Sequence, residues 1–244
     1  MLAIENKKHC AAIVLAAGQG KRMGTSVQKQ YIELEGKPLI YYSLKTFQES
    51  GLIDSVVLVV GEGQVAYAQN EIVSKYGFSK VCAVVEGGKE RYDSVWQGLK
   101  TVSQEPEVSY IYIHDGARPF VDDEILNRGY ETVEQFRACV AGMPSKDTVK
   151  VVDEQGFAIN TPDRKYVWVI QTPQIFEKSL IMEAYARLMK EEHEDVTDDA
   201  MAVERMMKVP VKMFEGSYQN VKITTPEDLA IAKVFLREKR PVYE

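Results

Sequence analysis

An apolar segment that leads directly into a glycine-rich, cationic loop constrains the fold of this chain more than any other feature. Residues 11–17 are predicted to form a strand, because an unbroken apolar run suits a strand that is covered on both faces. The next segment, 18–24, contains three glycines, which let backbone N–H groups turn toward an anion without a clash at Cβ. Lys21 and Arg22 add positive charge there. This pattern is typical of a phosphate-binding loop, although a tight strand-to-helix turn with incidental surface cations fits the same residues.

Two better-known glycine motifs do not fit this loop. The dinucleotide-binding pattern G-x-G-x-x-G requires a glycine where Met23 stands. The P-loop of NTPases requires a lysine and then serine or threonine after its last glycine, whereas Gly24 is followed by Thr25. The sequence therefore favours neither a dinucleotide-dependent dehydrogenase nor a P-loop NTPase.

The composition limits the class of protein. With 244 residues and 45% hydrophobic content, the chain can bury the core of one large α/β domain spanning residues 1–244. A net charge of −6 and scattered lysines and arginines argue against a nucleic-acid partner. We find no signal peptide and no apolar run long enough to cross a membrane, so we expect a cytoplasmic protein with no membrane partner. Cys10, Cys82 and Cys139 stand apart in apolar segments and are expected to be reduced core thiols.

Strand and helix patterns alternate along most of the chain. Short apolar runs predict strands, and amphipathic segments predict helices between them. The predicted strands are 11–17, 55–60, 81–86, 110–114 and 138–143, and the predicted helices are 38–49, 63–76, 90–102, 122–136, 177–192, 198–207 and 226–238. The alternation predicts an α/β fold with a mostly parallel sheet flanked by helices, whose ligands bind at the carboxyl ends of the strands.

The segment 144–171 interrupts this alternation. Residues 148–153 and 157–161 are predicted to pair as a protruding β-hairpin with Gly156 at the turn. A lone hairpin is only marginally stable in water. The hairpin therefore needs either the core or a second subunit to pack against.

Charged and small residues follow several of the predicted strands. Asp115 ends the strand 110–114, where a carboxylate is costly to bury unless it binds a cation or hydrogen-bond donors, so it is our candidate Mg²⁺ ligand. A helix N-cap or an ion pair with Arg118 would also explain this aspartate. Gly87–Gly88 precedes a helix that could present Ser94 inward, although an ordinary strand-to-helix turn fits these residues too.

A second cation stands near the C-terminal end of the sequence. Lys222 is predicted to end a short strand that begins at Asn220. A helix follows, with Thr225 as its N-cap and Pro226 at its first position. Taken alone, such a lysine is more often a solvated charge than a functional group.

A set of short motifs occurs in a characteristic order. The motifs are Leu15–Gly18 with Arg22 and Met23, Lys29–Tyr31, Gly87–Gly88, Arg91 with Ser94, His114–Pro119, Asp147–Thr148, Gln171–Gln174, Thr197–Asp199 and Asn220–Lys222. In this order, over roughly residues 11–236, they resemble the 2-C-methyl-D-erythritol 4-phosphate cytidylyltransferases of the non-mevalonate isoprenoid pathway.

The resemblance implies a Rossmann-like nucleotidyltransferase fold and a reaction. The expected enzyme transfers the cytidylyl group of CTP to 2-C-methyl-D-erythritol 4-phosphate and releases pyrophosphate. A pentitol phosphate cytidylyltransferase, such as one acting on ribitol 5-phosphate, is the alternative, although Trp168–Gln174 and Val196–Ala200 look more like the methylerythritol branch. A non-catalytic nucleotide-binding regulator is a further alternative, but it would not need a second set of cations around the α-phosphate.

The resemblance also implies roles for individual residues. The residues implied to offset charge on the reacting phosphates are Arg22, Lys29 and Lys222. Those implied to bind CTP are Leu15, Ala16, Ala17, Gly18, Gly20, Gly88, Ser94, Asp115 and Gly116. Those implied to bind the substrate phosphate are Arg118, Thr148 and Arg164, the last two reaching the neighbouring subunit of a homodimer through the β-arm at 144–171. Mg²⁺ would bind near Asp115 and bridge phosphate oxygens.

Overall fold

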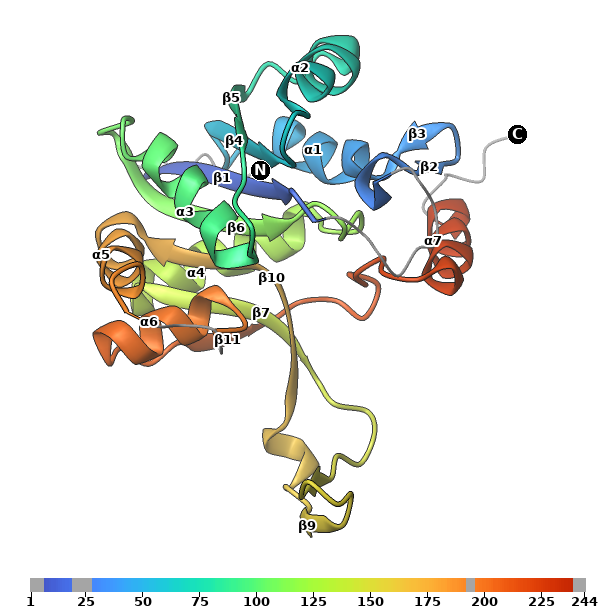
Figure 1. Cartoon of the computed structure of the whole chain (residues 1–244), viewed down its shortest axis with the longest axis vertical. Helices are drawn as coiled ribbons and strands as arrows, with labels where there is room; N and C mark the ends of the chain where they lie inside the picture. The colour runs from blue at the N-terminus through green and yellow to red at the C-terminus, as the bar shows by residue number, and fades with distance from the viewer. Residues whose placement is uncertain (1–6, 19–27, 192–195, 239–244) are drawn as a thin grey trace.

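A seven-stranded sheet forms the centre of the computed structural model, which describes residues 7–18, 28–191 and 196–238 (Figure 1). Its order is β11-β7-β10-β6-β1-β4-β5. The strands are β1 (His9–Ala16), β4 (Ser55–Val60), β5 (Val81–Glu86), β6 (Val108–Asp115), β7 (Ala138–Pro144), β10 (Trp168–Glu177) and β11 (Lys212–Glu215). Every pairing in this sheet is parallel except those of β10, which lies antiparallel to both β6 and β7. The expectation of a mostly parallel sheet is confirmed.

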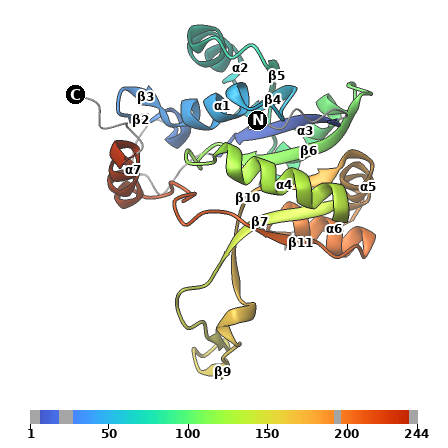
Figure 2. The same ribbon diagram turned by 180° about the vertical axis from the view of Figure 1, so that it is seen from behind.

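Helices cover both faces of the sheet, which explains the unbroken apolar runs of the central strands (Figures 1 and 2). One face carries α1 (Leu39–Glu49), α4 (Asp123–Phe136) and the helical segment that comprises α2 (Val65–Tyr67) and the π-helical residues Ala68–Ser74. The other face carries α3 (Arg91–Val102), α5 (Lys178–Leu188) and α6 (Asp199–Met207). Along β1, Ala12 and Val14 pack toward the first group of helices and Ala11 and Ile13 toward the second.

The last helix, α7 (Pro226–Glu238), lies beside the small hairpin of β2 (Glu33–Leu34) and β3 (Lys37–Pro38) (Figure 1). It covers a separate cluster that includes Phe120 and Ile223. The helix begins at Pro226 as predicted, but the preceding residues 220–222 form no strand, so that part of the prediction is wrong. Lys222 therefore lies in the irregular connection between β11 and α7.

Most predicted elements are confirmed to within two or three residues at each end, and the main error concerns β10. The sequence patterns showed an irregular stretch up to residue 171 and a helix from 177, whereas residues 168–177 form a continuous strand in the middle of the sheet. The short edge strand β11 was also missed. The helix predicted over 63–76 exists as α2 continued by a π-helix.

A β-arm protrudes from the sheet between β7 and β10 (Figure 1). Its strands are β8 (Val151–Val152) and β9 (Ala158–Asn160), which pair antiparallel and are followed by a short 3₁₀ turn, η4 (Arg164–Tyr166). Gly156 has a φ of 87° at the turn between them, where only glycine is unstrained. The predicted hairpin and its protruding position are confirmed, although the paired strands are shorter than the predicted 148–153 and 157–161.

Two expectations from composition have different outcomes. Cys10 and Cys139 are buried free thiols, and burial raises the pKa of Cys10 to about 12. Cys82 is exposed, because it lies on β5 at the edge of the sheet, so the expectation of a core thiol is wrong for this residue. Among the described residues, no helix combines the length and the apolar character needed to cross a bilayer.

Candidate active site

A cavity of about 640 Å³ lies at the carboxyl ends of β1, β4, β5 and β6. The chain runs from β1 outward to β4 and β5 and then crosses to β6 on the other side of β1, which makes this edge the place where α/β sheets bind ligands. The lining residues are Leu15, Ala16, Ala17, Gly18, Gln28, Lys29, Gln30, Gly61, Glu62, Glu86, Gly87, Gly88, Lys89, Glu90, Arg91, Ser94, Asp115, Ala117 and Lys222. Its size and its mixture of small and charged residues suit a nucleotide.

The loop after β5 approaches the end of β1 very closely. The Gly88 N–H donates to Ser94 Oγ at 3.1 Å, and the Ser94 hydroxyl donates to the Glu90 carbonyl at 3.1 Å. A Cβ added to Gly87 would lie 2.5 Å from Ser94 Oγ and 2.7 Å from Ala17 Cβ. Glycine is therefore required at position 87 to leave the backbones this close. Ser94 is buried and faces inward, as predicted.

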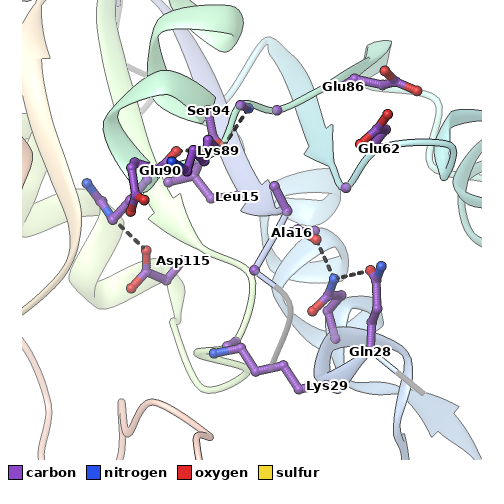
Figure 3. Close-up of a pocket in the computed structure, with 18 of the residues that line it drawn as sticks. Leu15, Ala16, Gln28, Lys29, Glu62, Glu86, Lys89, Glu90, Ser94 and Asp115 are labelled. Carbon is purple, nitrogen blue, oxygen red and sulfur yellow. Dashed lines mark hydrogen bonds and ion pairs between the residues drawn. The ribbon is translucent and has the colours of Figure 1, made fainter. Parts of the chain in front are cut away.

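Lys29 is held at the cavity by its two neighbours in the chain. The buried Gln30 side chain donates to the Ala16 carbonyl and to Gln28 Oε1, which ties the short turn Lys29–Tyr31 to the end of β1. Figure 3 shows Lys29 on the Asp115 side of the cavity, with Leu15 and Ser94 farther up. The predicted residues Gly20 and Arg22 belong to the segment 19–27, which lies outside the described residues.

Asp115 is the centre of a cluster of charges. Its Oδ2 forms an ion pair with Lys222 Nζ at 2.6 Å, and its Oδ1 accepts a hydrogen bond from Arg91 Nε at 3.3 Å. Burial alone would raise the pKa of this carboxyl, but the positive charges of Arg91 and Lys222 outweigh that effect and hold the pKa well below its usual range. The Asp115 side chain is therefore an ionised carboxylate at neutral pH. Neither alternative for Asp115, an N-cap or an ion pair with Arg118, describes its side-chain contacts.

Two side chains support Asp115 from behind the cavity. The Asp115 backbone N–H donates to Thr172 Oγ1 at 3.0 Å, and this hydroxyl lies 3.0 Å from His114 Nδ1. His114 Nε2 faces the Arg118 carbonyl at 3.1 Å, so this nitrogen carries the ring proton and Nδ1 accepts from Thr172. Burial lowers the pKa of His114 to about 4, and the imidazole is neutral.

The irregular segment that carries Lys222 is fixed by contacts with β10 and with Arg118. Gln171 Nε2 donates to the Ser217 carbonyl at 2.7 Å, and Asn220 Nδ2 donates to the Thr172 carbonyl at 2.8 Å. Arg118 donates to the Asn220 carbonyl at 2.7 Å. The Ile223 N–H, one residue beyond Lys222, donates to the Ala117 carbonyl at 2.8 Å, and together these bonds hold Lys222 opposite Asp115.

The structure brings most of the predicted residues with a described position to one place. The predicted residues that line the cavity are Leu15, Ala16, Ala17, Gly18, Lys29, Gly88, Ser94, Asp115 and Lys222. Gly116 lies under the site and faces Ile40, and Arg118 binds backbone carbonyls beside it.

Two predicted residues lie elsewhere. Thr148 and Arg164 are exposed on the β-arm, where Arg164 donates to the Lys146 carbonyl at 3.0 Å. The arm leaves the carboxyl end of β7 and extends below the sheet in Figure 1, and neither residue lines the cavity. Within one chain these two residues therefore do not join the other predicted residues.

Sequence reasoning gave no role to several residues that shape the site. They are Gln30, Arg91, Gln171, Thr172, Gln174 and Asp199. All six lie in the ordered motifs of the sequence, and Gln30 belongs to the motif Lys29–Tyr31. Motif membership was the available signal, but the contacts depend on segments far apart in the chain.

Comparison with known proteins adds independent findings. The family model for IspD, 2-C-methyl-D-erythritol 4-phosphate cytidylyltransferase, matches residues 10–238. A protein of that name from Lachnospira eligens is 53% identical over 93% of this chain and 98% of its own length. Another from Alkaliphilus oremlandii is 44% identical over 97% of this chain and 99% of its own length.

Solved structures agree with these relatives. The crystal structure of 4-diphosphocytidyl-2C-methyl-D-erythritol synthase from Anaerococcus prevotii superposes with a TM-score of 0.83, at 33% identity, over 95% of this chain and 97% of that one. The 2-C-methyl-D-erythritol 4-phosphate cytidylyltransferase from Thermus thermophilus superposes with a TM-score of 0.72, at 27% identity, over 94% and 99% of the two chains.

Proposed function

Since this chain belongs to the family of 2-C-methyl-D-erythritol 4-phosphate cytidylyltransferases, we propose that it catalyses the reaction that the family name states. It transfers the cytidylyl group of CTP to 2-C-methyl-D-erythritol 4-phosphate, giving 4-diphosphocytidyl-2-C-methyl-D-erythritol and pyrophosphate, a step of the non-mevalonate isoprenoid pathway. The observation that carries the proposal is the match over residues 10–238, which includes every described residue that lines the cavity. The same extent supports treating residues 1–244 as one nucleotidyltransferase domain.

The cytosine and ribose of CTP are proposed to bind between the ends of β1 and β5. The backbone of Leu15–Gly18 and the Gly87–Gly88 turn leave room for a flat ring, and their N–H and C=O groups can read its edge. Ser94 supports this surface by accepting the Gly88 N–H. The triphosphate would then extend toward Gly20 and Arg22, as the sequence predicts.

The reaction is an attack by a substrate phosphate oxygen on the α-phosphorus of CTP. The new P–O bond forms as the bond from the α-phosphorus to the bridging oxygen breaks, and pyrophosphate leaves with that bond's electron pair. Negative charge builds up on the phosphate oxygens in the transition state, so positioned cations lower the barrier. Lys29 and Lys222 are proposed to supply this charge, and Lys222 would exchange part of its contact with Asp115 for the phosphates.

The residues present fit a bound Mg²⁺. Mg²⁺ usually takes one or two protein carboxylates and completes its coordination with substrate phosphates and water. Asp115 is an ionised carboxylate at the cavity, and the described residues contain no cluster of three or more His, Cys, Asp or Glu that would favour another metal. When bound with CTP, the ion would neutralise phosphate charge.

The β-arm supports a homodimer. Its exposed apolar side chains are Val149, Val151, Val152, Phe157, Ile159, Tyr166, Val169 and Ile170. A monomer would leave this apolar surface exposed to water. In a two-fold symmetric dimer, the same surface of each subunit would be buried against the other subunit. We propose that the arm of each subunit reaches the partner's active site, where Thr148 and Arg164 bind the substrate phosphate.

The three free thiols support a reducing compartment, and we place the enzyme in the cytoplasm.

A pyrophosphate-release assay tests the function. The protein with CTP and 2-C-methyl-D-erythritol 4-phosphate should release pyrophosphate rapidly, and with ribitol 5-phosphate it should release little. Preference for ribitol 5-phosphate would establish the pentitol alternative. CTP binding without turnover on either substrate would establish the regulator.

A further inference from the structure

A buried ion cluster lies directly behind the active-site cavity. Asp199, at the start of α6, is fully buried and does not line the cavity. Its two carboxylate oxygens each accept a hydrogen bond from a terminal nitrogen of Arg91, both at 2.8 Å. The third donor group of the same guanidinium, Nε, points to Asp115 Oδ1 at 3.3 Å. Arg91 therefore connects a buried carboxylate to the carboxylate of the active site.

Three other elements fix the position of Asp199. The Tyr185 hydroxyl of α5 donates to Asp199 Oδ1 at 2.5 Å, and its ring stacks on Trp96 of α3 with centroids 6.4 Å apart. Gln174 Oε1 of β10 accepts the backbone N–H groups of Asp199 and Ala200 at 3.0 and 2.9 Å. These contacts hold the Asp199 carboxylate in one position independently of the Arg91 side chain.

The geometry of arginine makes the contact with Asp199 directional. A guanidinium is planar, so a carboxylate that accepts one N–H from each terminal nitrogen fixes the orientation of the plane and, with it, the direction in which the Nε–H points. In this structure that N–H faces Asp115. Without Asp199, the two terminal N–H pairs of Arg91 would lose their partner beside a cavity built for a polyanion.

We propose that Asp199 is a positioning residue for cytidylyl transfer. By holding the terminal nitrogens of Arg91, Asp199 directs Nε toward Asp115. It also keeps the guanidinium from turning toward the phosphates of CTP, which Lys29 and Lys222 are proposed to bind. Asp115 then keeps one orientation, which leaves its other oxygen for Lys222. This inference rests on the proposed function of the cavity.

The main test is Asp199→Asn. Asparagine keeps the shape but presents an N–H₂ group to one arm of the guanidinium, so the paired contact is lost. We expect kcat to fall about 10- to 100-fold, the scale of a lost hydrogen bond to a charged group. Because the site also loses one negative charge, the dissociation constant for CTP measured by calorimetry should stay equal or become lower. A purely structural role would weaken CTP binding together with kcat.

A matched control separates charge and helix effects from the contact with Arg91. Asp198→Asn makes the same charge change one residue earlier, and asparagine remains a good N-cap for α6. It removes the acceptor of Gln174 Nε2 at the same end of the helix, but it leaves the contacts of Gln174 Oε1 with the backbone of Asp199 and Ala200, and it does not touch Arg91. We expect a change in kcat of less than about threefold. An equal fall in both variants would overturn the proposal.

A double-mutant cycle tests whether Asp199 acts through Arg91. In an Arg91→Gln background, adding Asp199→Asn should change kcat by less than about twofold, because the residue it positions is gone. Additive losses would overturn the proposal.

A milder variant and a reference measurement complete the design. If Asp199→Asn does not fold, Tyr185→Phe removes only the supporting hydroxyl and should lower kcat about threefold, and an unchanged kcat would then refute the proposal. The wild-type protein is assayed first. If it does not turn over, the proposed function fails, and if it does but Asp199→Asn has wild-type kcat, only the positioning role fails.

Discussion

Acidification below pH 6.5 should destabilise this protein through one buried residue, His114. The imidazole is fully buried, packs edge-on against Phe47 and forms hydrogen bonds with Thr172 and the Arg118 carbonyl. Burial lowers its pKa from 6.5 to about 4. The neighbouring charges act in opposite directions, since Asp115 raises this pKa and Arg118 lowers it.

The sign and the size of the effect follow from this shift. Above pH 6.5 His114 is neutral in both the folded and the unfolded chain, so it contributes no pH dependence. As the pH falls from 6.5 toward about 4, the unfolded chain binds a proton that the folded chain does not. The free energy of unfolding should therefore fall by up to about 1.4 kcal/mol per pH unit, or about 3 kcal/mol over the whole window.

Urea unfolding of the wild type and of His114→Gln, at several values between about pH 7 and about pH 4.5, measures this contribution. Glutamine can still donate to the Arg118 carbonyl but does not titrate, so the variant should be less stable at neutral pH and less sensitive to acid. The other histidines are common to both proteins and cancel in the comparison. Equal dependence on pH in the two proteins would refute the reasoning.

Three further predictions concern the active site and the assembly. Lys29→Ala or Lys222→Ala should each lower kcat about 100-fold or more in steady-state assays with a smaller change in CTP affinity, and a loss confined to KM would contradict a role in the transition state. Activity should require Mg²⁺ or Mn²⁺ and disappear in excess EDTA, with Asp115→Asn raising the metal concentration needed for half activity; full activity in EDTA would exclude the metal site. Mixing Arg164→Ala with Lys29→Ala protein should restore about a quarter of wild-type activity once subunits exchange, because each mixed dimer then has one intact site. No recovery after confirmed exchange would contradict the shared site.

The sequence predicted the parts of the fold that local patterns encode. β1 and β4 are apolar runs that match their burial, and the order of strands and helices predicts the edge where the cavity lies. β10 was missed because its central residues are Gln171, Thr172, Pro173 and Gln174, which resemble a turn. They are buried because each polar side chain binds another segment rather than water.

The candidate site was predicted in its composition but not in its connections. Asp115 and Lys222 were both expected near the phosphates, yet their contact at 2.6 Å joins residues from distant parts of the chain. Asp199 resembles an ordinary helix start in the sequence, and only the fold brings it to Arg91. Local periodicity and propensity carry no information on such pairs, since they depend on how β10 and α6 are placed against the rest of the sheet.

The reversed strand β10 also determines the order in which the molecule can be completed during synthesis. β7 is made before β10, but it joins the sheet only through β10, which lies between it and β6. Until residues 168–177 leave the ribosome, the nascent sheet therefore ends at β6, with the backbone of Tyr110–Ile113 unpaired along one edge. Such an edge is a template for pairing with other chains. One late strand thus closes that edge and, through Gln171, Thr172 and Gln174, also binds Ser217, Asp115 and Asp199, so the surroundings of the cavity are completed only after this strand has been made.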